Sequence, residues 1–144
     1  MKKIETEIDI KAQPDQVWKV LMDFKNHPLW NPFIKSISGT PREGNNITVE
    51  LGDVGEKGMV FKPKVLICKE NQEFRWKGKL LVRGIFDGEH YFKMKTNDSG
   101  GCTFIQGEKF SGLLVPFVGG LLRDTKGNFK LMNDALKTHV EEEG

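Results

Sequence analysis

The chain opens with alternating apolar and polar residues, which is the pattern of a strand with one buried face. Pro14 then suits the first turn of a helix, where its missing N–H costs nothing. Pro28 and Pro32 interrupt the helical pattern that follows, so residues 26–32 form either a second short helix or a tight loop. The apolar-face positions of this strand and first helix are Ile4, Thr6, Ile8, Ile10, Val17, Trp18, Val20, Leu21 and Phe24.

The middle of the chain, residues 33–112, has the alternation and the turn residues of consecutive strands. The connections between these strands are short, and short connections favour an antiparallel meander over parallel crossovers. The predicted strands are Phe33–Ser38, Asn46–Leu51, Met59–Lys69, Glu73–Leu81, Arg83–Thr96 and Cys102–Gly112.

The last segment changes to a helical period, with apolar residues at steps of three and four from Val118 to Val140. A helix from about Gly120 to Glu141 would be about 33 Å long, although Gly127 inside it costs roughly 1 kcal/mol relative to alanine. Two short helices alone cannot cover so many strands, so this helix must lie across the concave side of the sheet. We therefore predict one α+β domain over residues 1–144, of order β-α-α-β6-α, with a curved antiparallel seven-stranded sheet.

Composition narrows the range of partners. A net charge of +2 over 144 residues, with no basic run beyond Lys2 and Lys3, argues against nucleic acid. The charged start does not suit a signal peptide, and the longest apolar-leaning segment, residues 112–122, is too short to span a membrane. We expect a cytoplasmic protein without stable membrane insertion, and the oligomeric state stays open. Cys68 and Cys102 are expected to be buried free thiols.

The sequence lacks the motifs of several common catalytic and binding sites. It has no Gly-rich phosphate loop, no Gly-x-Ser-x-Gly and no His-Glu-x-x-His motif. Its three histidines, His27, His90 and His139, fall in different predicted elements and do not form an evident metal site. We therefore expect neither a metal nor another cofactor.

One hairpin brings two ionisable residues together. If the chain folds back about Ser99, Thr96 lies across from Cys102 and His90 lies across from Glu108. Residues directly opposite on one face of a sheet have Cβ atoms about 4.5–5.5 Å apart, so His90 and Glu108 can touch. The alternation places both on the inner face, whereas the opposite face, which includes Tyr91, is mostly polar and should face water. The pair could fix the register of the sheet, mark the polar end of a ligand or transfer protons.

Aromatic residues surround this pair in the predicted fold. The chain has 10 Phe and 3 Trp but only 1 Tyr, so apolar contacts outweigh polar ones. Rings around inward polar residues are typical of a small-molecule pocket, although each ring alone also suits core packing. Residues 112–120 form an unusually apolar connection that is either buried, a gate at the cavity mouth or a membrane-touching tip. The candidate ligand-binding residues are Trp30, Phe33, Phe61, Trp76, Phe86, His90, Phe92, Glu108, Phe110, Phe117, Phe129 and Met132.

Five strings in this order resemble the helix-grip proteins of the START-like, or SRPBCC, superfamily, in particular its bacterial polyketide-cyclase/dehydrase-like branch. The strings are IKAQPDQVW at 10–18, DF at 23–24 followed by WNPF at 30–33, GEH at 88–90, EKFSGLL at 108–114 and FKLMNDALK at 129–137. The resemblance implies a deep cavity between the sheet and the C-terminal helix. Members of the superfamily bind lipids, sterols, flavonoids, plant hormones or polyketides, and some are cyclases or hydrolases, so the fold does not decide the function.

Three functions remain open from the sequence. The first is a binder of a small hydrophobic molecule of lipid, polyketide or aromatic type that performs no catalysis. The second is a cyclase, dehydratase or hydrolase in which His90 and Glu108 act as catalytic acid and base. The third is a module that regulates a chaperone ATPase, as one branch of the superfamily does.

Overall fold

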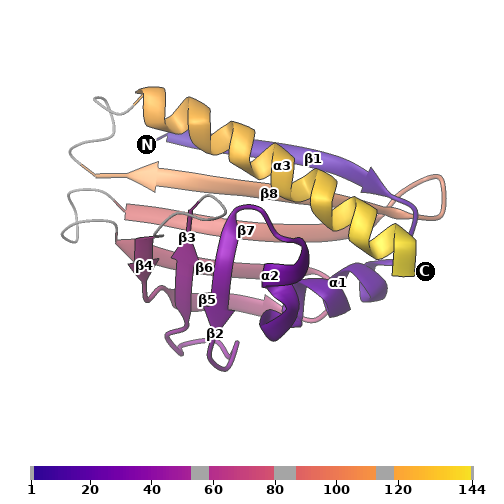
Figure 1. Ribbon diagram of the computed structural model, residues 1–144, viewed down its shortest axis with the longest axis horizontal. Helices are drawn as coiled ribbons and strands as arrows, with labels where there is room; N and C mark the ends of the chain where they lie inside the picture. Colours follow the sequence, from indigo (N-terminus) through magenta and orange to yellow (C-terminus); the bar gives the residue numbers. More distant parts are fainter. Residues whose placement is uncertain (1, 53–58, 80–86, 113–118, 144) are drawn as a thin grey trace.

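The computed structural model describes residues 2–52, 59–79, 87–112 and 119–143 (Figure 1). The order of its elements is the predicted one, a strand and helices followed by strands and a long final helix. The helical elements are α1 (Pro14–Met22), a short 3-10 turn (Phe24–Asn26), α2 (His27–Trp30) and α3 (Gly119–Glu143). The strands are β1 (Lys2–Ile10), β2 (Ile34–Ser38), β3 (Thr48–Leu51), β4 (Met59–Phe61), β5 (Lys64–Lys69), β6 (Glu73–Lys79), β7 (Asp87–Thr96) and β8 (Cys102–Ser111).

The prediction of one seven-stranded sheet is wrong in its count and its continuity. The expected strand Met59–Lys69 divides at Pro63 into β4 and β5, because proline has no N–H for a ladder hydrogen bond. The strands then form a five-stranded sheet of order β1-β8-β7-β6-β5 and a three-stranded sheet of order β2-β3-β4. In Figure 1 the strands of the smaller sheet run across the direction of the longer strands.

The predicted hairpin register is confirmed. β7 and β8 pair antiparallel, with Thr96 opposite Cys102 and His90 opposite Glu108. The turn residue Asn97 stabilises this register, since its Oδ1 accepts hydrogen bonds from the backbone N–H groups of Ser99 and Gly101 at 3.0 Å each.

The final helix covers the larger sheet, as predicted. Figure 1 shows α3 lying along β1 and β8. Its apolar stripe at Phe129, Met132, Leu136 and Val140 is at most 3% exposed, and this stripe forms the core with the inward face of the sheet. Lys137 fastens the helix to the edge strand, because its Nζ donates to the backbone carbonyl of Asp9 at 2.9 Å.

The corner between α1 and α2 is built around a buried histidine. Nε2 of His27 donates to the backbone carbonyl of Leu21 at 2.6 Å, and Nδ1 accepts from the side-chain amide of Asn31 at 3.1 Å. The same Asn31 accepts the backbone N–H groups of Phe33 and Ile34 at 2.9 Å each through its Oδ1. Residues 26–32 therefore include a short helix, one of the two predicted forms, and Phe24 lies beyond the end of α1.

Tyr91 corrects the prediction that the mostly polar outer face of β7 faces water, because this residue of that face is buried. It is 1% exposed because its ring lies over Gly107 of β8, where a Cβ atom would collide with it. The guanidinium of Arg75 covers the ring at 4.7 Å from its centroid. The hydroxyl donates to Glu5 at 2.5 Å, and burial together with that carboxylate raises the pKa of Tyr91.

The two cysteines are free, as predicted, but only one is fully buried. Cys102 begins β8, an interior strand of the larger sheet, and burial raises the pKa of its thiol to about 11. Cys68 is half-buried because β5 is an edge strand of the larger sheet. Among the described helices, none is long and apolar enough to cross a membrane. The expected single domain and cytoplasmic location stay predictions.

Candidate functional site

A cavity of about 220 Å³ lies where the two sheets and α3 meet. One side comes from the smaller sheet and the segment before it, the other from β6, β7 and β8, and α3 contributes Thr125 and Asn128. Most of the exposed lining is apolar. The lining residues are Phe33, Leu51, Gly52, Met59, Phe61, Trp76, Gly78, Gly88, His90, Glu108, Phe110, Thr125 and Asn128.

Two paired glycines make room for the cavity. Gly78 of β6 and Gly88 of β7 are direct cross-strand partners. A Cβ atom on Gly78 would lie 3.1 Å from the ring of Phe61, and a Cβ atom on Gly88 would overlap Oε2 of Glu108. Glycine at both positions therefore lets a ring and a carboxylate stand directly over the sheet, as expected where other groups approach a strand closely.

Glu108 and His90 form the polar end of the cavity. Nδ1 of His90 lies 2.9 Å from Oε1 of Glu108, and the two side chains are 3% and 14% exposed. Nε2 of His90 lies 3.0 Å from the side-chain oxygen of Gln106. Both nitrogens of the ring therefore face oxygen atoms, so neither is left for a ligand.

A chain of hydrogen bonds behind His90 has only one possible direction. The hydroxyl of Thr6 donates its hydrogen to the backbone carbonyl of Gln106 at 2.9 Å. The hydroxyl oxygen of Thr6 must therefore accept from Nδ2 of Asn133, which lies 2.8 Å from it. Oδ1 of Asn133 then accepts from Nε2 of Gln106 at 2.7 Å, which turns the oxygen of Gln106 toward His90. Because an amide oxygen only accepts, Nε2 of His90 carries a hydrogen.

Aromatic rings enclose the imidazole of His90. Trp76 stacks on it with ring centroids 5.0 Å apart, and Phe92 and Phe129 lie at 4.6 and 4.8 Å. Phe33 closes the cavity side at 6.3 Å. Aromatic faces attract cations, so this environment is compatible with an imidazolium paired to the Glu108 carboxylate.

The structure brings together half of the predicted site residues. Phe33, Phe61, Trp76, His90, Glu108 and Phe110 line the cavity. Phe92, Phe129 and Met132 lie in the core instead, at most 1% exposed and absent from the lining. Trp30 is on α2, away from the cavity, and its ring lies 6.0 Å from that of His139. Phe86, Phe117 and most of the predicted 112–120 gate lie outside the described residues.

Sequence reasoning missed the polar chain that supports His90. Asn133 follows Phe129 by four positions and is 2% exposed, so it sits within the apolar stripe of α3. A polar residue at such a stripe position signals a buried hydrogen-bond partner. Gln106 shares the inner face of β8 with Glu108 and gives the same signal, whereas the two glycines under the cavity had no signal beyond their residue type.

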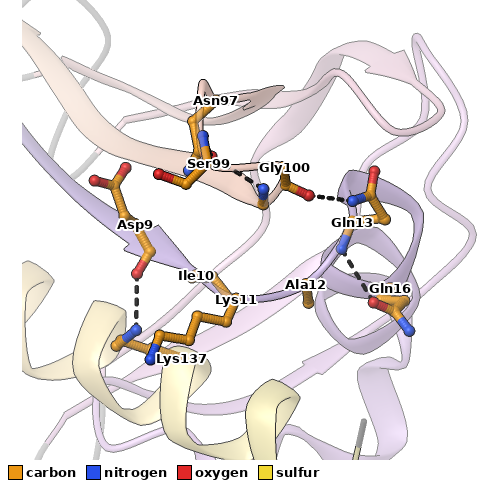
Figure 2. A pocket seen from close by; sticks show the side chains of 11 residues that line it. Asp9, Ile10, Lys11, Ala12, Gln13, Gln16, Asn97, Ser99, Gly100 and Lys137 are labelled. Atoms are coloured by element: carbon orange, nitrogen blue, oxygen red, sulfur yellow. Dashed lines mark hydrogen bonds between the residues drawn. The ribbon is translucent and has the colours of Figure 1, made fainter.

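Larger hollows elsewhere on the surface have a more polar lining than this cavity. The one in Figure 2 has a volume of about 500 Å³ and lies between the β7–β8 turn, the start of α1 and α3. Its polar groups bond one another, since Gln13 donates to the carbonyl of Gly100 and Lys137 to that of Asp9. We place the functional site at the smaller cavity because its lining is more apolar. Among the described residues, no group of three His, Cys, Asp or Glu could hold a metal ion.

Solved structures share this fold at low sequence identity. Protein MLL2253 from Mesorhizobium loti is 14% identical, with 98% of both chains covered and a TM-score of 0.78. A START superfamily protein from Mycobacterium smegmatis is 18% identical, with 99% of both chains covered and a TM-score of 0.74. The di-domain ARO/CYC protein StfQ from the steffimycin biosynthetic pathway is 14% identical over 98% of this chain and 51% of its own, with a TM-score of 0.76.

These likenesses confirm the α+β helix-grip fold, and together with a family-model match over residues 1–141 they confirm the START-like, or SRPBCC, resemblance. A comparison with curated protein sequences found no match. The family model described as "Polyketide cyclase / dehydrase and lipid transport" matches residues 1–141. The chain therefore belongs to the polyketide cyclase/dehydrase and lipid transport family.

Proposed function

We propose that this protein binds one small, largely apolar molecule in the cavity between its two sheets and α3, and that it performs no catalysis on it. The observation that carries the proposal is the cavity itself, whose described lining combines aromatic walls with one carboxylate, that of Glu108. Such a combination of apolar surface and few polar groups is typical of small-molecule sites. The burial of His90 and the engagement of both its ring nitrogens support binding over catalysis.

The size of the cavity limits the ligand. A dry apolar cavity of about 150 Å³ in another protein holds one benzene molecule. The 220 Å³ enclosed by the described residues suits a compound of one or two rings. Trp76, Phe61 and Phe33 supply flat apolar surfaces for such a compound.

Titration with naphthalene, followed by calorimetry, tests the proposal. We expect saturable binding of one molecule per chain. Gly88→Ala should weaken it at least tenfold, because the new methyl group pushes the Glu108 side chain into the cavity. Gly127→Ala is the matched control, since a Cβ atom there has nothing within 4 Å. Absence of saturable binding by neutral ring compounds would refute the proposal. Native mass spectrometry of the purified protein would then identify any molecule that it retains.

A second candidate is proton transfer, which the free oxygen of Glu108 favours. A carboxylate that faces an apolar cavity, with a histidine behind it, has the arrangement of a general base. The test is deuterium exchange at the α-carbon of bound 2-tetralone in D₂O, followed by NMR. Acceleration that is lost in Glu108→Gln would support catalysis, and exchange at the uncatalysed rate would count against it.

A further inference from the structure

One oxygen of Glu108 is free for a ligand. Oε1 is bonded to His90, whereas Oε2 makes no hydrogen bond with any residue that the structure describes. Oε2 stands over the Cα atom of Gly88, where only a glycine leaves space for it. The side chain is 14% exposed and lines the cavity, so this oxygen is open to a bound molecule.

The hydrogen count makes this oxygen an acceptor. The 2.9 Å hydrogen bond between Nδ1 of His90 and Oε1 contains one proton, which belongs either to the ring or to Oε1. In both forms Oε2 carries no hydrogen and can only accept. It is therefore an acceptor whichever of the two partners owns the proton.

The chain behind His90 holds the acceptor in place. Gln106 fixes Nε2 and Glu108 fixes Nδ1, so the imidazole is held at both ends. Asn133 of α3 orients Gln106 in turn. The carboxylate therefore meets a ligand in one orientation, and little conformational entropy is lost when a hydrogen bond forms.

Among the lining residues that the structure describes, a negatively charged ligand meets no lysine or arginine. His90 also lines the cavity, and Glu108 already pairs with it. Burial of an anion without a partner costs much more free energy than burial of a neutral molecule.

We propose that Glu108 selects the ligand by its polar group: the cavity accepts a neutral one- or two-ring compound with a hydroxyl that donates to Oε2, and it rejects a carboxylate of the same shape. This inference rests on the proposed function and adds the chemical class of the ligand. A plain hydrocarbon leaves Oε2 without a hydrogen bond inside the cavity, whereas a hydroxyl supplies one, so the hydroxyl should dominate selectivity.

Three probes of one shape test the selectivity: naphthalene, 2-naphthol and 2-naphthoate, titrated at pH 7 by calorimetry. We expect 2-naphthol to bind at least tenfold more tightly than naphthalene, and 2-naphthoate to bind at least tenfold more weakly than 2-naphthol. Equal affinities for the three probes, or tightest binding of 2-naphthoate, would overturn the inference. If none of them binds, the proposed function fails instead.

Variants assign the selectivity to Glu108. Glu108→Gln replaces the carboxylate by a neutral amide, so the advantage of 2-naphthol over 2-naphthoate should shrink at least tenfold. Glu7→Gln is the matched control, because Glu7 is an exposed residue of β1 outside the cavity. Circular dichroism verifies that both variants fold. Unchanged selectivity in folded Glu108→Gln would also contradict the inference, and the comparison in the unmodified protein decides it if that variant does not fold.

Discussion

His27 and His90 are almost equally buried, at 1% and 2% exposure, yet the atoms around the two rings differ in whether they donate or accept hydrogen bonds. His27 faces a backbone carbonyl on one side and an amide donor on the other. His90 faces a carboxylate on one side and an amide oxygen on the other. A neutral ring satisfies the first pair, whereas the second pair needs a further proton between Nδ1 and Glu108.

The difference separates a structural histidine from one at a site. Every hydrogen bond of His27 is made within residues 21–31, and its ring fastens α2 to α1. Burial lowers the pKa of His27, which keeps it neutral. His90 is instead hydrogen-bonded to the carboxyl group of Glu108, which lines the cavity. Depth of burial alone therefore says little about the role of a histidine, and the donors and acceptors around it say more.

The largest expected effect is a loss of stability when Asn31, the hydrogen-bond partner of His27, is replaced. Asn31→Ala removes the acceptor of two backbone N–H groups and the donor to His27. We expect the free energy of unfolding, measured with urea, to fall by about 3 kcal/mol, because buried groups are left unsatisfied.

Asn97→Ala is its matched control. Oδ1 of Asn97 also accepts two backbone N–H groups, but in a hairpin turn where the bond from Ser99 is exposed and water can replace it. We expect the free energy of unfolding of this variant to fall by less than about 1 kcal/mol. Equal losses in the two variants would show that the His27 corner does not depend on its buried position.

The next effect is a dependence of the free energy of unfolding on pH, which we attribute to His27. Its pKa is lowered in the folded protein from an ordinary value of 6.5, so below that pH the unfolded chain binds a proton that the folded chain does not. The free energy of unfolding should fall as the pH decreases below 6.5, by up to about 1.4 kcal/mol per pH unit until the folded-state pKa is reached. In His27→Gln this part of the slope should disappear, and an unchanged slope would assign it to other groups.

The last prediction concerns which ring nitrogens of His27 and His90 carry a hydrogen, and it involves no change in stability. Nitrogen NMR of the histidine rings should show a bare Nδ1 for His27, which accepts from Asn31, and an Nδ1 for His90 that shares a proton with Oε1 of Glu108. Nε2 should carry a hydrogen in both rings. A bare Nε2 in His90 would mean that Gln106 is turned the other way and that the polar chain runs in reverse.

Local features of the fold could be predicted because they depend on neighbours along the chain. Counting outward from Ser99 placed His90 opposite Glu108, since pairing across a short hairpin follows from the position of its turn. The period of the last segment likewise predicted α3. Pro63 was visible in the sequence, but its effect depends on which strands lie beside it, so the second sheet was missed.

By itself, the sequence determined the order of the elements, the inner faces of β1, β7 and β8 and the contact between His90 and Glu108. Only the tertiary structure decided the second partner of His90, because Thr6 and Asn133 are 127 positions apart and meet Gln106 only when β1 and α3 pack on β8. It also decided the cavity, which forms where two sheets and a helix leave space above two glycines. Such contacts join residues distant along the chain, and no local pattern encodes them.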